Sequence, residues 1–192
     1  MNSKLKSSVT ALLKTKLNST LMFCGVAALA LGTVACQDND NDTPTNIITE
    51  QDREYAKNTA YSNLAEISMG QLALSKSTNP TVREFAEIMV NDHGTAQGEL
   101  RELSASLQIS LPDTLKTEDR LVQEGLNVLE GAAFDNAYVN AQVLAHEESH
   151  EVQQVQVDQG VNVELRDYAT RTSNRIQMHL EMARQLRDEL LP

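Results

Sequence analysis

The sequence contains no tryptophan, and aromatic residues make up only 4% of its 192 positions. Glycine and proline are also scarce, with 8 and 4 copies. Strands favour aromatic and β-branched side chains, and tight turns favour Gly and Pro, so a fold rich in strands is disfavoured. Ala, Leu, Glu and Gln are abundant instead. The composition therefore predicts an all-α fold.

Cysteine and positive charge are also in short supply. The two cysteines, Cys24 and Cys36, both lie near the N-terminus, which excludes a disulfide framework in the rest of the chain. The chain has 16 basic and 27 acidic residues, for a net charge of −11. A surface this acidic repels phosphate groups, so we expect no nucleic-acid partner.

The first 35 residues have the organisation of an export signal. Four lysines precede the apolar run Leu21–Ala35, which is shorter than the roughly 20 residues needed to span a bilayer. Thr33-Val34-Ala35-Cys36 resembles a bacterial lipobox, although Thr33 stands where Leu is usual. Residues 1–35 are therefore predicted to be a lipoprotein signal peptide, with lipid on Cys36 as the membrane anchor. A plain secretory signal with Cys36 as a stray thiol is the alternative.

Residues 36–49 are predicted to form an acidic flexible tether. The segment QDNDNDTPTN after Cys36 contains no apolar residue and cannot contribute to a core. Its acidic run resembles the surface-export signal of lipoproteins in the Bacteroidetes. We therefore expect an outer membrane lipoprotein of the bacterial cell envelope, facing the periplasm or the cell surface.

Residues 50–192 are predicted to form one helical domain. Asn79 and Pro80 indicate a helix start, and Gly160 indicates a helix end. The short connections at these two points predict two helical hairpins, packed as a ferritin-like four-helix bundle. The expected long helices span 50–78, 80–108, 131–159 and 162–190, and a short extra helix at 117–130 lies in the long connection between the hairpins.

Two of the four histidines, His93 and His179, stand in the middle of apolar helical stripes. Counting outward from the first hairpin turn puts Glu66 and His93 at the same height. The same count from the second turn puts His146 and His179 about one helical turn apart. We therefore expect Glu66, His93, His146 and His179 to converge, one from each long helix.

Two hypotheses account for this layer. In the first, it is a structural polar layer in which His93 and His179 hydrogen-bond to Glu66 and to neighbours, and the protein is a non-enzymatic envelope protein. In the second, the Glu/His cluster binds a transition metal such as zinc, iron or copper. A ferritin-type di-iron centre is disfavoured, because only Glu147-x-x-His150 has the required spacing. No catalytic residue is assigned, since motifs for nucleophilic or phosphate chemistry are missing.

Four segments carry a resemblance to a known family: LAEISMGQLAL at 64–74, NPTVREFAEIMVNDH at 79–93, GAAFDNAYVNAQVLAH at 131–146 and IQMHLEMA at 176–183. They resemble the bacterial domain-of-unknown-function family 4142, which is placed in the ferritin-like superfamily and whose members are described as outer membrane proteins. The resemblance implies the bundle and the envelope location but no activity. It marks Glu66, Asp92, His93, Phe134, Asp135, Tyr138, Gln142, His146 and His179. The polar residues Asp92, Asp135, Tyr138 and Gln142 are thus expected to extend the core layer. The chain departs from the family pattern at Ser173-Asn174 and at Met178.

Overall fold

The computed structural model describes residues 47–190. The predicted signal peptide, Cys36 and nearly all of the predicted tether lie outside the described residues. Within them the secondary structure is helical, and no strand is present. The helices are α2 (Glu50–Lys76), α3 (Pro80–Ser106), α4 (Thr117–Asn127), α5 (Gly131–Gln159) and α6 (Val163–Leu190).

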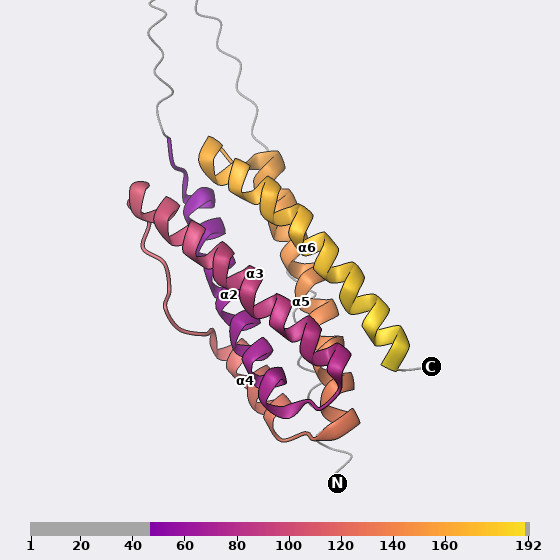
Figure 1. Cartoon of the computed structure of the whole chain (residues 1–192). Coiled ribbons are helices and arrows are strands. Elements are labelled where there is room, and N and C mark those ends of the chain that lie inside the picture. The colour runs from indigo at the N-terminus through magenta and orange to yellow at the C-terminus, as the bar shows by residue number, and fades with distance from the viewer. Residues whose placement is uncertain (1–46, 191–192) are drawn as a thin grey trace, which may run out of the picture. The chain divides into compact units, whose positions relative to one another are not determined.

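The four long helices form the predicted bundle of two hairpins (Figure 1). Helices α2 and α3 form one hairpin, and α5 and α6 form the other. The hairpins pack through α2 against α5 and through α3 against α6, while α4 lies against α2 and α5. The predicted all-α, ferritin-like bundle with a short helix in the long connection is confirmed.

Local signals explain the starts of α2 and α3. Asn79 accepts hydrogen bonds from the backbone of Thr81 and Val82, and Pro80 occupies the first turn of α3, as predicted. Helix α2 begins with a capping box that the sequence analysis did not identify, in which Thr49 and Asp52 exchange hydrogen bonds. These caps satisfy backbone N–H groups that would otherwise lack partners.

Asp52 also ties the start of α2 to the second hairpin. Its carboxylate accepts hydrogen bonds from the Gln156 side chain at 2.8 Å and from the backbone of Val161 and Asn162 at 3.2 and 3.3 Å. Burial raises the pKa of Asp52, but the hydrogen bonds from Thr49, Gln156 and Asn162 outweigh burial and leave it below its usual value. Asp52 is therefore a charged link between the two hairpins.

Several predicted boundaries differ from the structure. Helix α2 ends at Lys76 and not at residue 78, because Ser77 adopts an extended conformation ahead of the Asn79 cap. Helix α3 ends at Ser106, and the next residue but one, Gln108, has a positive φ of 55° that stops the helix. Helix α4 ends at Asn127 and not at residue 130, and α6 begins at Val163.

Two further helix ends have no side-chain cap. The N-cap of α4 is Lys116, and its side chain makes no capping hydrogen bond. Gly160 is the C-cap of α5, as predicted, but its backbone is extended, with φ −62° and ψ 142°. A side chain is excluded there by space, because a Cβ atom on Gly160 would lie 2.5 Å from the carbonyl oxygen of Gln156.

Helices α2 and α3 approach each other closely at Gly70. A Cβ atom on Gly70 would lie 2.8 Å from Cγ2 of Val90 and 3.0 Å from the carbonyl oxygen of Ala86. Both distances are shorter than a normal van der Waals contact. Glycine therefore sets the separation between the two helices of the first hairpin.

The core consists of two apolar clusters separated by a polar layer. Towards the α2–α3 turn the cluster includes Met69, Phe85, Met89, Leu126, Phe134, Tyr138, Leu180 and Leu186. Towards the other end it includes Tyr55, Leu100, Leu107, Ile109, Leu165 and Tyr168. The residues between them include Asn63, Glu66, His93, His146 and His179, all buried. The polar layer therefore crosses the middle of the bundle.

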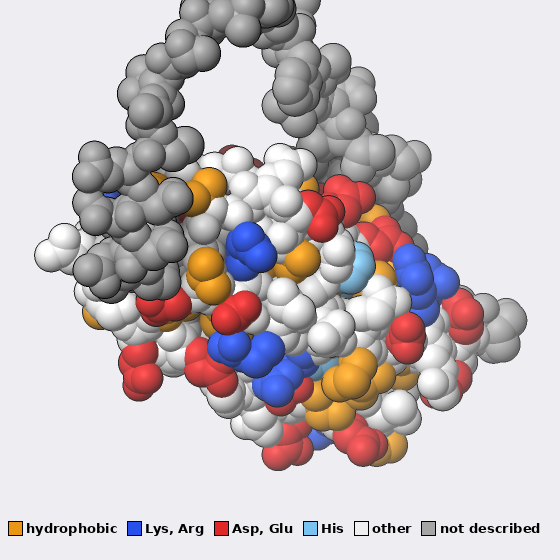
Figure 2. All heavy atoms as spheres, turned by 90° about the horizontal axis from the view of Figure 1, so that it is seen from above, with side chains coloured by type: hydrophobic (Ala, Val, Ile, Leu, Met, Phe, Trp, Pro, Cys, Tyr) orange, Lys and Arg blue, Asp and Glu red, His pale blue; other side chains and the backbone are white. Residues whose placement is uncertain are grey.

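The surface of the bundle is charged. Figure 2 looks down on the bundle from above and shows acidic and basic side chains intermixed over the visible face, with small hydrophobic patches between them. Among the described helices, none combines the length and apolarity that a membrane span requires.

Candidate metal centre

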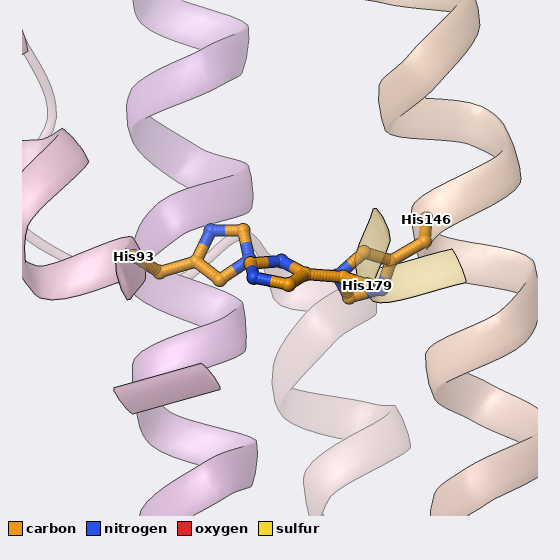
Figure 3. A group of neighbouring side chains, drawn as sticks. All are labelled: His93, His146 and His179. Carbon is orange, nitrogen blue, oxygen red and sulfur yellow. The ribbon is translucent and has the colours of Figure 1, made fainter. Parts of the chain in front are cut away.

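Three histidines meet in the polar layer. His93 comes from α3, His146 from α5 and His179 from α6, and their rings face one another (Figure 3). The ring centroids are 5.6 Å apart for His93 and His146, 5.3 Å for His93 and His179, and 5.4 Å for His146 and His179. One nitrogen from each ring lies within 4.8 Å of the other two. We refer to these residues as the histidine trio.

The orientation of His93 is fixed by two hydrogen-bonded side-chain amides, Asn63 of α2 and Gln97 of α3. His93 Nδ1 lies 3.0 Å from Asn63 Oδ1. The amide nitrogen of Asn63 donates to Gln97 Oε1 at 3.3 Å, and its oxygen faces the ring. An amide oxygen only accepts hydrogen bonds, and His93 therefore carries its proton on Nδ1.

The other two rings have equally defined tautomers. His146 Nδ1 lies 2.9 Å from the backbone carbonyl oxygen of Gln142, which can only accept. His179 Nε2 lies 2.9 Å from the Asp92 carboxylate, which also accepts. His146 therefore carries its proton on Nδ1, and His179 carries its proton on Nε2.

The remaining nitrogen of each ring has no hydrogen-bond partner. These atoms are Nε2 of His93, Nε2 of His146 and Nδ1 of His179, and all three are buried. A buried polar atom without a partner is costly, and native proteins seldom leave three of them in one place. Each unpartnered nitrogen has a free lone pair, and the three side chains that carry them lie next to one another.

Burial also keeps imidazoles of the trio neutral. It lowers the pKa of His93 well below its usual value, and the nearby His146 and His179 lower it further. The pKa of His179 falls to about 4, because burial outweighs the opposing hydrogen bond to Asp92. These two side chains are therefore uncharged at neutral pH, which is the form that binds metal ions.

Glu66 is placed next to the trio but is not part of it. Its Oε1 lies 3.9 Å from His146 Nδ1, the nitrogen that already donates to Gln142. Its Oε2 is buried and has no partner, and burial raises the pKa of this carboxyl group. The structure thus brings together three of the four predicted ligands, His93, His146 and His179. Glu66 lies next to His146, outside the trio.

The hydrogen bonds of the layer go to neighbours other than Glu66. The structural-layer hypothesis has His93 and His179 bonded to Glu66 and to other neighbours, and in the structure their partners are the neighbours Asn63 and Asp92. The α2–α3 turn runs from Ser77 to Asn79, so its midpoint is one and a half residues earlier than the sequence count assumed. This shift places Asn63, one turn before Glu66, opposite His93. Asn63 could have been found only with the correct end of α2.

The remaining predicted layer residues lie on α5, on the N-terminal side of His146. Tyr138, Gln142 and His146 follow one another at four-residue spacing and so share one face of the helix. The Tyr138 hydroxyl, both amide atoms of Gln142 and Oδ1 of Asp135 are buried without partners. Phe134 stacks on Tyr138, with ring centroids 6.0 Å apart. His150 is half-buried and lies 3.3 Å from Ser173 Oγ, outside the trio.

The donor set of the trio fits a transition metal. Zinc, copper and iron accept neutral imidazole nitrogens at about 2.1 Å, which places ligand nitrogens about 3.3 Å apart around a tetrahedral ion. The 4.8 Å limit on the nitrogen separations is compatible with this spacing after small side-chain rotations. The N–H of each ring also donates a hydrogen bond to a protein acceptor, which is the usual support of metal-binding histidines.

A family model described as "Domain of unknown function (DUF4142)" matches residues 37–186. No curated protein matches the chain.

Two solved structures share the fold. One is a DUF305 protein from Streptomyces coelicolor that is thought to be secreted, with a TM-score of 0.65, 12% sequence identity, and coverage of 73% of this chain and 92% of that chain. The other is a DUF305 fragment from Deinococcus radiodurans, with a TM-score of 0.68, 11% identity, and coverage of 74% and 98%. At these identities the likeness concerns the fold alone.

Proposed function

The chain belongs to the DUF4142 family, and we propose that it is a metal-binding protein of the bacterial cell envelope. The ligands are His93, His146 and His179. The carrying observation is that each imidazole donates a hydrogen bond from one nitrogen to a protein acceptor and leaves the other nitrogen buried and unpartnered, while one nitrogen of each ring lies within 4.8 Å of those of the other two rings. Zinc, copper and iron suit this donor set.

A tetrahedral ion held by three protein ligands has one coordination position left. Zinc sites of this kind keep that position for water or a substrate, whereas closed structural sites use four protein ligands. A bound ion would supply Lewis acidity or electron transfer, depending on its identity. The chain's own contribution is to orient the three rings through Asn63, the Gln142 carbonyl and Asp92, and to bury them away from bulk solvent.

The metal content of the purified protein tests this proposal. Wild-type protein prepared without chelator, or reconstituted with zinc, copper or iron, should hold about one ion per chain. His93→Gln combined with His179→Gln should abolish binding, while His150→Gln should retain it, because His150 lies outside the trio. Elemental analysis measures the ions, and circular dichroism verifies that each variant is folded. A folded wild-type protein that binds none of the three metals would refute the proposal.

A structural polar layer is the second candidate. Its support is that the hydrogen bond between His179 and Asp92 joins α6 to α3, and that between His93 and Asn63 joins α3 to α2. Such a layer would fix the register of the hairpins without an ion. It predicts that the double histidine variant loses stability to the same extent in metal-free and metal-supplemented buffer.

We also propose that Cys36 is lipidated and anchors residues 50–192 to the cell envelope through a tether at 36–49. The support is the apolar run before Thr33-Val34-Ala35-Cys36 and the acidic, apolar-free segment after it. The anchored domain then faces the periplasm or the cell surface.

The anchor has a direct test. Cys36→Ser should prevent lipid incorporation and move the protein from the membrane fraction to the soluble fraction. Cys24→Ser is the matched control and should leave both properties unchanged, because Cys24 would be removed with the signal. An unlipidated wild-type protein would contradict the proposal.

A further inference from the structure

The three acceptors that hold the histidine trio differ in their access to solvent. Asn63 is 2% exposed and Gln142 is 0% exposed, so the helices of the bundle cover the rings on those sides. The Asp92 side chain is 33% exposed, although it contacts His179, which is 1% exposed. Asp92 is therefore the one acceptor of the three that links the buried rings to the surface.

A groove runs along the same seam between α3 and α6. Its volume is about 200 Å³, and its lining includes Ile88 and Met182. Ile88 lies four residues before Asp92 on α3, and Met182 lies three residues after His179 on α6. The groove thus begins about one helical turn from the trio. Phe85 and Leu186, which belong to the apolar cluster towards the α2–α3 turn, also line the groove.

An arginine stands at this surface position. Nη1 of Arg175 lies 3.8 Å from Asp92 Oδ1, while Asp92 Oδ2 contacts His179. The Arg175 side chain is 46% exposed, so it can move away into solvent. A second pair, Arg171 with Glu99, lies on the same two helices at the same 3.8 Å distance but contacts no histidine of the trio.

We propose that a metal cation reaches the trio through the α3–α6 seam at Asp92, and that Arg175 slows this step. The proposal rests on the proposed metal-binding function. An arriving cation is attracted to the partly exposed carboxylate of Asp92, whose Oδ2 lies 2.9 Å from His179 Nε2. The guanidinium of Arg175 offsets the charge of this carboxylate and repels the cation, so it must swing out before the ion can pass.

The rate of cobalt(II) binding to the metal-free protein tests this inference. Cobalt(II) prefers the same ligands as zinc and gains visible absorption when imidazoles bind it, so stopped-flow absorbance reports loading. Arg175→Gln should load on the order of fivefold faster than wild type, as expected for removing one positive charge beside the path. Arg171→Gln removes the same charge from the same helix and should load at the wild-type rate.

Three outcomes decide the matter. Faster loading in Arg175→Gln alone supports the seam at Asp92. Equal acceleration in both variants, or no acceleration in either, overturns it, because then only net charge or another route controls access. If wild-type protein shows stoichiometric cobalt at equilibrium, the metal function survives such a failure. If no cobalt binds at any concentration, both proposals fail together.

Discussion

At the scale of single residues, the surroundings of the trio distinguish the two nitrogens of each ring: one donates a hydrogen bond, and the other has no partner. Three chemically different acceptors, an amide, a backbone carbonyl and a carboxylate, fix which nitrogen carries the proton. Burial then keeps His93 and His179 neutral by lowering their pKa values. Because the unpartnered nitrogens are already deprotonated, metal binding near neutral pH should release few protons from these two rings.

The same pKa values predict how acid affects the metal-free protein. His179 has a folded pKa of about 4, against about 6.5 when unfolded. As the pH falls from 6.5 towards 4, the unfolded chain takes up a proton that the folded protein excludes, so stability is lost. The contribution of His179 to the free energy of unfolding should fall by about 2 kcal/mol between pH 7 and pH 5. Urea unfolding at a series of pH values measures it.

His179→Gln provides the comparison for this measurement. Burial raises the pKa of Glu66, so Glu66 adds stability as the pH falls, the opposite sign to His179. That contribution is common to both proteins and cancels in the difference between them. The variant should show a flatter loss of stability with acid. Parallel curves for wild type and variant would mean that His179 is not held neutral by the fold.

At the scale of helices, the close approach of α2 to α3 explains why residue 70 is a glycine, whereas helix propensity does not. Glycine inside a helix costs stability relative to alanine, yet Gly70 and Gly98 both stand inside helices. A Cβ atom at Gly70 would contact Val90 and the Ala86 carbonyl, whereas a Cβ atom at Gly98 meets nothing within 4 Å. The two positions should therefore respond to alanine in opposite directions.

Gly70→Ala should destabilise the protein by about 1–3 kcal/mol, because α2 and α3 must move apart. Gly98→Ala should stabilise it by about 0.5–1 kcal/mol through helix propensity. Chemical denaturation of the two variants beside wild type gives both values. Stabilisation by Gly70→Ala would show that the hairpin has room for the added methyl group.

At the scale of the whole molecule, the bundle could be predicted because its signals are local. Apolar stripes in the sequence predicted the helices, and Asn79-Pro80 and Gly160 predicted the positions of the two hairpin turns. The meeting of His93, His146 and His179 was predicted from counting residues outward from those turns. The count placed His146 and His179 about one helical turn apart, and in the structure their ring centroids lie 5.4 Å apart.

The partners of the rings could not be predicted in the same way. A shift of one and a half residues in the first turn exchanges Glu66 for Asn63 opposite His93. The choice of Asp92 as the acceptor for His179 depends on how two distant helices pack, since these residues are 87 positions apart. Local sequence signals carry no information on that packing.

The distribution of the trio over the hairpins has a consequence for the order of folding. His146 and His179 belong to one hairpin with a short turn, so their rings can meet as soon as that hairpin closes. His93 belongs to the other hairpin and joins them only when the two hairpins dock across the long segment around α4. Closing a short local loop is faster than assembling distant segments. We therefore expect completion of the trio to be a late event, which marks arrival at the final tertiary arrangement.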